Sequence, residues 1–224
     1  MDAKTDLLEK GAILQRDKET YAVVPHIPGG IIFDPNLLRR IADIAEKYNA
    51  KVLKLTTAQR IAIVGIKEEQ IDNIWADLDM QPGAAAGLCV RSIKICPATH
   101  FCRVAQQDAV TLGLELDKRY HGMQLPSKFK MSVSGCANCC TEPATKDLGI
   151  MGTPKGYTIF VGGNGGVKAK VGTVLAQNVA PDDVLPLVEK IMSYYKENGQ
   201  KHERLGKVMD RLGFDKVKKD ILGE

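Results

Sequence analysis

Two cysteine pairs constrain this chain more than any other feature of its sequence. The first pair, Cys96 and Cys102, encloses the segment Pro-Ala-Thr-His-Phe, and the second pair lies within Gly135–Cys140, which reads Gly-Cys-Ala-Asn-Cys-Cys. Each short segment fixes two thiolates, so a fold that brings the segments together encloses a compact metal centre. The sequence therefore predicts a metal site built from two separate stretches of chain, with the surrounding residues forming a cofactor wall.

The spacing of the cysteines leaves three interpretations open: structural zinc, an iron-sulfur cluster, or no metal. Structural zinc usually takes closer C-x2-4-C pairs, whereas the five residues between Cys96 and Cys102 suit the wider corners of a 4Fe-4S cluster. The second segment pairs Cys136 with either Cys139 or Cys140. Spacing by itself favours iron-sulfur without choosing between those two partners.

The motif C-x5-C followed by G-C-x-N-x-C resembles the signature of the siroheme and 4Fe-4S sulfite and nitrite reductases. The resemblance selects as cluster ligands Cys96, Cys102, Cys136 and Cys140. It implies that the sulfur of Cys140 bridges the cluster to the siroheme iron. Cys139 then occupies a position that need not be a cysteine.

Five further segments resemble landmarks of this family and follow in family order: His26–Gly30, Lys54–Arg60, Arg91–Cys96, Leu125–Lys130 and Val161–Gly166. Within the family, the chain is most similar to small single-repeat assimilatory-type sulfite reductases and to the siroheme part of the NADH-dependent nitrite reductase large subunit. The full-size enzymes contain two such repeats, and this chain contains one. The resemblance implies siroheme and a 4Fe-4S cluster as cofactors. Because no flavin or nicotinamide region is recognisable, we expect an external electron donor such as a ferredoxin.

Composition argues against nucleic-acid binding and against a membrane location. The chain has 31 basic and 27 acidic residues, a formal charge of +4, and no basic run with interleaved aromatics, so a nucleic-acid partner is not expected. No apolar stretch approaches the roughly 18 residues of a membrane span, and the N-terminus lacks the apolar core of a signal peptide. We therefore expect a cytoplasmic protein whose cysteines ligate metal rather than cross-link. Cys89 is expected to be a small buried apolar residue.

The pattern of apolar residues predicts an α+β fold with a ferredoxin-like half-domain over residues 1–82 and an α/β siroheme and 4Fe-4S domain over residues 83–224. The Pro/Gly/Ala-rich stretch 81–87 marks the boundary. In the first domain we expect strands at 21–25, 51–56 and 60–65 and a helix capped by Asp34-Pro35 that ends near Asn49. Its predicted buried face comprises Leu37, Leu38, Ile41, Ile44, Ala45 and Tyr48. A second helix carries Ile71, Ile74, Trp75 and Leu78, which completes a ferredoxin-like order.

In the second domain, a helix is expected to open at Cys102 and close at Gly122, with a buried stripe of Phe101, Ala105, Ala109, Leu112, Leu116 and Tyr120. Strands follow at 128–134, 147–151 and 157–161, then a helix from Pro181 and a helical cap over 201–224. The alternation of residues 128–134 places Lys128 and Lys130 on one face of a strand that leads to Cys136.

The resemblance assigns chemistry to several cations. Arg91, Lys128 and Lys130 match the substrate-facing cations of the family, the lysines through the motif Leu-Pro-x-Lys-Phe-Lys. An arginine binds oxyanions bidentately, and a lysine whose pKa is lowered donates protons. His26 stands where the family has an arginine, which bears on substrate preference and pH dependence because histidine titrates near neutrality.

Further candidate cofactor contacts are Lys54, Gln59 and Arg60 for siroheme carboxylates, and Asn138 and Asn164 for the cluster loop or a cofactor edge, although turn roles are equally compatible with the two asparagines. The glycines of Gly162–Gly166 allow close backbone approach but match no nucleotide-binding fingerprint.

The leading hypothesis is a siroheme-dependent six-electron reduction of sulfite to sulfide. The alternatives are a physiological nitrite reductase that forms ammonia, a non-enzymatic iron-sulfur or tetrapyrrole electron carrier, and a zinc-stabilised binding module. A pure electron carrier has no need of anion-binding cations, which favours an enzyme. The sequence leaves open whether the chain is a monomer or a homodimer.

Overall fold

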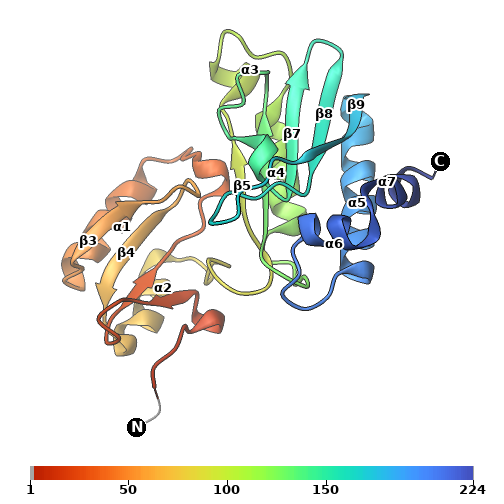
Figure 1. Ribbon diagram of the computed structural model, residues 1–224. Coiled ribbons are helices and arrows are strands. Elements are labelled where there is room, and N and C mark those ends of the chain that lie inside the picture. The colour runs from red at the N-terminus through yellow and green to blue at the C-terminus, as the bar shows by residue number, and fades with distance from the viewer. Residues whose placement is uncertain (1–2, 224) are drawn as a thin grey trace. The chain divides into compact units, whose positions relative to one another are not determined.

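The computed structural model describes residues 3–223, and the chain divides into two compact units between Gly87 and Leu88 (Figure 1). Each unit has its own β-sheet, of four strands in the first and five in the second. No helix within residues 3–223 is both long and apolar enough to cross a membrane.

The first unit is an antiparallel sheet with two helices. Its strands, in the spatial order β1-β2-β4-β3, are β1 (Ala12–Leu14), β2 (Tyr21–Val23), β4 (Ile61–Ile66) and β3 (Val52–Leu55). The helices are α1 (Asn36–Lys47) and α2 (Ile71–Leu78), and short 3-10 turns are η1 (Leu8–Lys10), η2 (Pro28–Gly30) and η3 (Glu68–Gln70). The predicted ferredoxin-like order of strand, helix, strand, strand, helix is confirmed. The additional strand β1 was not predicted.

The helix α1 begins where the sequence predicts. The Asp34 carboxylate accepts the Asn36 N–H at 2.9 Å, and the chain leaves the helix at Asn49, which has a φ of 52°. The predicted buried face is correct at Ile41 and Ile44 and wrong at Leu38, which is 46% exposed. All four predicted apolar residues of α2 are buried.

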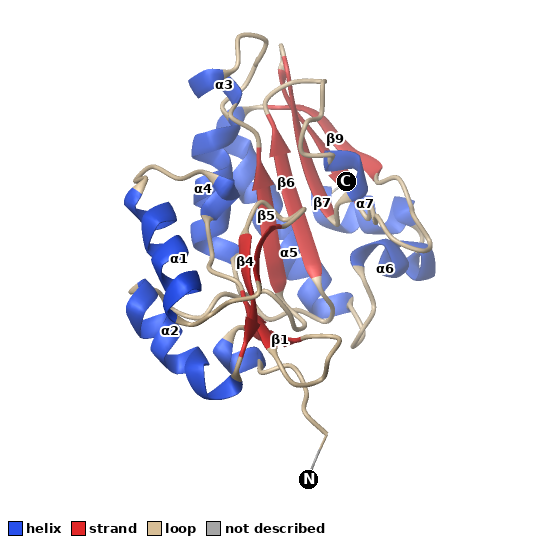
Figure 2. Cartoon of the chain, turned by 90° about the vertical axis from the view of Figure 1, so that its left-hand side faces the viewer, coloured by secondary structure: helices blue, strands red, loops and turns tan. Residues whose placement is uncertain are grey.

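The second unit is a mixed sheet in the order β5-β6-β7-β8-β9. Its strands are β5 (Val90–Ile95), β6 (Phe129–Ser134), β7 (Leu148–Thr153), β8 (Gly156–Val161) and β9 (Thr173–Val179). β5 pairs with β6 and β6 pairs with β7 in parallel, whereas the pairs β7–β8 and β8–β9 are antiparallel. Figure 2 shows α4 (Ala109–Tyr120) and α5 (Pro181–Asn198) together behind this sheet, and α6 (Leu205–Leu212) and α7 (Phe214–Leu222) pack with α5. The sequence did not predict β5 or β9.

The two faces of β5 and β6 differ in chemistry. Parallel neighbours in register point to the same side, so the pairs Ser92↔Lys130 and Lys94↔Ser132 form one polar face with Ser134. The 3-10 turn η4 (Pro143–Thr145) contacts β6 and β7. The predicted strand is confirmed over Phe129–Ser134, with Lys130 on its polar face and Lys128 just before its first residue. However, Ser132 and Ser134 on that face are fully buried, because both sides of this interior strand are covered.

The helix predicted to open at Cys102 is wrong in its first part. A single turn, α3 (Ala98–Phe101), precedes Cys102, and α4 begins at Ala109. The Asp108 carboxylate caps α4 by accepting the N–H groups of Val110 and Thr111, each at 3.0 Å. Phe101, predicted in the buried stripe, is 76% exposed. Residues 102–107 instead turn toward the second cysteine segment, as described next.

Candidate metal and cofactor site

The two cysteine segments meet at the carboxyl ends of the neighbouring parallel strands β5 and β6. Cys96 follows β5, and its N–H donates to the Val133 carbonyl at 3.2 Å. The Gly135 N–H donates to the Cys96 Sγ at 3.1 Å. The N–H groups of Gln106 and Gln107 donate to the Gly135 carbonyl at 2.8 and 3.0 Å. The structure thus joins both segments at the sheet end where α/β proteins commonly bind ligands.

This approach requires glycine at two positions. A Cβ at Gly135 would lie 2.7 Å from the Gln107 carbonyl oxygen and 2.9 Å from the Ala98 Cβ. A Cβ at Gly152, on β7, would lie 2.5 Å from the Gly135 carbonyl oxygen. The backbones of the cysteine segments and of β7 are therefore in direct contact.

The thiols at this junction differ in exposure. All six cysteines are free, and Cys96 is buried whereas Cys140 is exposed. Burial raises the pKa of Cys96, the Gly135 N–H opposes that shift, and the nearby Cys140 and Cys136 raise the pKa further. Cys139 has a φ of 51°, and its Sγ lies 3.3 Å from the Met151 Sδ on β7.

Cys89 stands apart from this group in the chain. It directly precedes β5, at the strand end opposite to Cys96, and is 2% exposed. The prediction that it is a small buried apolar residue is confirmed.

The predicted substrate-facing cations also come together. Lys130 is half-buried, and burial lowers its pKa, with further lowering by Arg204, Lys128, Lys146 and Arg91. The structure thus brings Arg91 and Lys128 near Lys130. It adds Lys146 and Arg204, which sequence reasoning missed. These five cations are called the cation cluster below.

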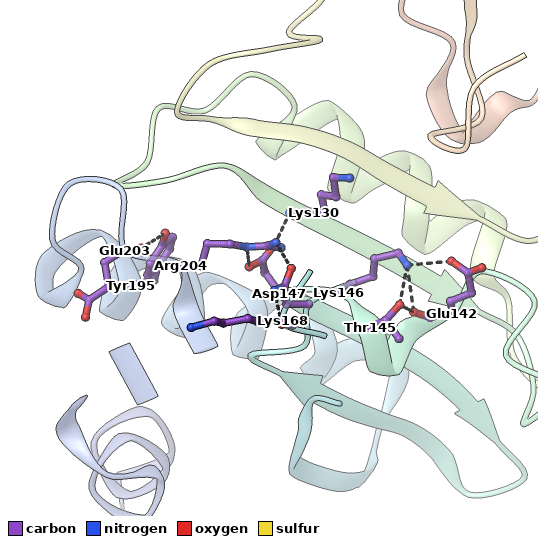
Figure 3. A network of polar contacts seen from close by, with 10 residues as sticks. Lys130, Glu142, Thr145, Lys146, Asp147, Lys168, Tyr195, Glu203 and Arg204 are labelled. Carbon is purple, nitrogen blue, oxygen red and sulfur yellow. Dashed lines mark hydrogen bonds and ion pairs between the residues drawn. The ribbon is translucent and has the colours of Figure 1, made fainter. Parts of the chain in front are cut away.

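Glu142 connects this cluster to the cysteine junction. It lies two residues after Cys140, and its Oε2 is 3.2 Å from the Lys94 Nζ. The same Oε2 is 3.0 Å from the Lys146 Nζ (Figure 3). Both lysine side chains are largely buried, with exposures of 14% and 9%. The pKa of Glu142 is lowered by its hydrogen bonds to Lys146 and then to Lys94. The sequence signal for these residues was weak, because isolated lysines are usually solvated.

The glycine-rich loop after β8 packs against protein at Gly162 and Gly163 and is exposed at Gly165 and Gly166. A Cβ at Gly162 would lie 2.5 Å from the Met209 Sδ, and one at Gly163 would lie 2.5 Å from the Ala144 carbonyl oxygen. Asn164 exchanges two backbone hydrogen bonds of 2.8 Å with Lys170. A cavity of about 340 Å³ adjoins the loop, and its lining includes Asn164, Lys168, Lys170, Arg204, Lys207 and Asp210.

The remaining predicted contacts lie partly in the first unit. Arg60 is buried and Gln59 adopts a φ of 58°. A Cβ at Gly30 would lie 2.7 Å from the Gln59 Cβ, so the two landmark segments of this unit are in contact. Lys54 is exposed on the edge strand β3, and His26 is half-buried. In the second unit, Asn138 is exposed.

Comparison with known proteins identifies the class. Residues 86–224 match the family model described as "Nitrite and sulphite reductase 4Fe-4S domain", and residues 13–81 match "Nitrite/Sulfite reductase ferredoxin-like half domain". The chain belongs to this nitrite and sulfite reductase family and is an oxidoreductase with siroheme and a 4Fe-4S cluster as its cofactors. The predicted family, fold class and cofactors are confirmed.

Individual relatives cover the chain to different extents. It is 39% identical to the assimilatory-type sulfite reductase of Nitratidesulfovibrio vulgaris, over 96% of this chain and 98% of that protein. It is 38% identical to nitrite reductase [NAD(P)H] of Bacillus subtilis, over 92% of this chain but only 25% of that protein. It is 34% identical to the nitrite reductase (NADH) large subunit of Escherichia coli, over 95% of this chain and 25% of that protein. The chain thus spans about a quarter of these nitrite reductases.

Two solved structures share the fold. Dissimilatory sulfite reductase I superimposes with a TM-score of 0.81 at 19% identity, over 91% of this chain and 69% of that chain. The NirA protein of Mycobacterium tuberculosis gives a TM-score of 0.79 at 20% identity, over 92% and 41% of the respective chains.

The residues of the second unit fit both cofactors chemically. Free thiols from two joined segments form a donor set for an iron-sulfur cluster, and the Gly135 N–H supplies a hydrogen bond to the Cys96 sulfur. Siroheme is a polycarboxylate, and the cation cluster offers the arginine and lysine donors that carboxylates require.

Proposed function

We propose that this enzyme reduces sulfite to sulfide in a six-electron reaction, with electrons from an external donor such as a ferredoxin entering through the 4Fe-4S cluster. One observation carries the proposal: a single unit holds both the joined cysteine segments and the cation cluster, and Glu142, two residues after Cys140, forms an ion pair with Lys146 of that cluster. An electron carrier would need the thiols alone. The similarity to the assimilatory-type sulfite reductase, over nearly its full length, supports sulfite as the substrate.

The residues that would hold the cluster are Cys96, Cys102, Cys136 and Cys140, and Cys140 is the one that would also contact the siroheme. A bound siroheme would supply the electrons for the reduction. Further contacts to the siroheme or the cluster loop are proposed from the family motifs alone. The residues are His26, Lys54, Gln59, Arg60, Asn138 and Asn164.

The chain's own cations act on the anion and on protons. Arg91 and Lys128 attract and orient the anionic substrate through hydrogen-bond donors that carry positive charge. Lys130 holds a proton at its Nζ and releases it more readily than an ordinary lysine, since burial and four neighbouring cations lower its pKa. Water formed from the departing substrate oxygens requires such a proton supply.

Nitrite is the second candidate substrate, because the chain is 34–38% identical to nitrite reductases over most of its length. Sulfite and nitrite titrations of the anaerobically purified holoenzyme, with a chemical reductant, separate the two. A larger kcat/KM for sulfite supports the proposal, and a larger value for nitrite replaces it. Siroheme and iron-sulfur absorbance without turnover of either anion would identify an electron carrier.

The substitution Lys128→Ala tests the anion-binding role. We expect kcat/KM for sulfite to fall by about 10²-fold, the typical effect of removing one charge-stabilising donor, while the cofactor spectrum stays unchanged. Lys190→Ala, an exposed lysine of α5, is the matched control and should leave turnover unaltered. Equal turnover in Lys128→Ala and wild type would refute the assignment.

A further inference from the structure

Asp147 is a fully buried carboxylate at the start of β7, and it binds three donors. Its Oδ1 accepts the Arg204 Nε at 2.9 Å and its Oδ2 accepts the Arg204 Nη2 at 2.5 Å (Figure 3). The same Oδ2 accepts the backbone N–H of Lys130 at 2.8 Å. One carboxylate thus fixes both the guanidinium and the strand that carries Lys130.

The guanidinium extends the connection to the glycine-rich loop. The Arg204 Nη1 donates to the Asn164 Oδ1, and the Asn164 Nδ2 donates to the Lys168 carbonyl at 3.0 Å. Arg204 immediately precedes α6. A single buried ion pair therefore links the strand β6, the start of β7, the loop after β8 and the C-terminal helices.

The strand at Lys130 is also held from its other side. The Phe129 ring packs on the Tyr195 ring of α5 at a centroid distance of 5.3 Å, and the Tyr195 hydroxyl donates to the Glu203 carbonyl at 2.8 Å. Asp147 fixes the Lys130 backbone while Tyr195 fixes the preceding side chain. Lys130 therefore has little freedom to move along or away from the strand.

Burying an ion pair is costly, because desolvation offsets most of its attraction, and apolar replacements are often no less stable. The side chain of Asp147 is 1% exposed and that of Arg204 is 15% exposed. Stability alone is therefore a weak reason for placing this pair beside a proton-donating lysine. Its bidentate geometry and its contact with Lys130 indicate a role in organising the site.

We propose that Asp147 and Arg204 form a positioning pair for Lys130: the carboxylate fixes the lysine backbone, and the guanidinium, held by that carboxylate, places a positive charge in the neighbourhood of Lys130. This inference rests on the proposed function, in which Lys130 supplies protons.

The other charged or titratable groups around Lys130 are Arg91 of β5, Lys128 just before β6, Lys146 after η4 and, through the neighbouring Phe129, Tyr195 of α5. Three of these are cations, and burial raises the pKa of the Tyr195 hydroxyl, which stays neutral. Within residues 3–223, the carboxylate that accepts the Lys130 backbone N–H is that of Asp147. Neutralising either member of the pair should consequently change the charge felt by Lys130 in opposite directions.

The test measures the pKa of Lys130 directly, by the pH dependence of its acetylation with trace acetic anhydride, read by mass spectrometry on the full-length protein. Asp147→Asn removes the negative charge that offsets Arg204 and should lower the acetylation midpoint of Lys130 by about one pH unit. Arg204→Gln removes the positive charge and should raise that midpoint by about one unit, the usual size of a nearby charge effect. Arg204→Lys keeps the charge and should leave the midpoint close to wild type. Asp210→Asn, which neutralises the exposed partner of Lys170, is the matched control and should not move it.

Opposite shifts in Asp147→Asn and Arg204→Gln support the proposal. If Arg204→Gln does not fold, a lowered midpoint in Asp147→Asn with an unchanged one in Arg204→Lys supports it equally. Unshifted midpoints accompanied by a lower melting temperature would show a purely structural ion pair and overturn it. The acetylation measurement does not depend on turnover, so it can be interpreted even if sulfite is not the substrate. Failure of the proposed function would be seen separately, in the kinetic assay of Lys128→Ala.

Discussion

Replacing Gly135 by alanine tests whether contact between the two cysteine segments is needed to assemble the cluster. The added Cβ would lie 2.7 Å from the Gln107 carbonyl oxygen and 2.9 Å from the Ala98 Cβ, where ordinary contacts begin at 3.4 Å. The first cysteine segment must therefore retreat by about 0.7 Å, and overpacking of this kind costs about 1–3 kcal/mol. The same retreat lengthens the hydrogen bonds from Gln106 and Gln107 to the Gly135 carbonyl, now 2.8 and 3.0 Å.

We expect Gly135→Ala to lower the free energy of unfolding by about 1–3 kcal/mol and to reduce the iron and acid-labile sulfide bound per chain. Urea denaturation and elemental analysis of anaerobically purified protein measure the two effects. Gly165→Ala is the matched control, because a Cβ there meets nothing within 4 Å. Wild-type iron content and stability in Gly135→Ala, or equal losses in both variants, would refute the reasoning.

Two further predictions concern local electrostatics. Asp108→Ala removes the cap of α4 and should lower the free energy of unfolding by about 0.5–2 kcal/mol, seen as a lower melting temperature. Asp108→Asn keeps a capping side chain and should retain most of the wild-type stability. Equal melting temperatures in all three proteins would contradict the capping role. The lowered pKa of Glu142 means that its bonds to Lys94 and Lys146 stabilise the fold above the ordinary glutamate pKa of 4.5 and are lost as pH falls through the lower folded value. Urea midpoints between pH 3 and 6 should therefore fall less steeply in Glu142→Gln than in wild type, and parallel curves would exclude this contribution.

Sequence information was sufficient wherever the determining interactions are local. The hydrogen bond of Asp34 at the start of α1 and the apolar spacing of α2 each depend on residues a few positions apart, and both predictions are confirmed. The strand β6 was also predicted, but its polar face is buried at Ser132 and Ser134, which the local alternation did not indicate. The cysteine spacing and the associated motifs also identified the family, because a metal cluster requires particular donor residues at particular intervals. The assignment of individual residues to the cofactors stays a prediction.

Only the tertiary structure decided which distant segments share the site. Residues 102–107 look helical in sequence, yet Gln106 and Gln107 give their N–H groups to Gly135 of another segment. Arg204 carries no recognisable motif, but β6, β7 and the turn before α6 bring it onto Asp147, beside Lys130. Such contacts depend on strand pairing and helix packing between residues far apart in the chain. The spacing and periodicity of the sequence encode each segment's local conformation, whereas the neighbours of its charged groups are fixed only when the segments pack together.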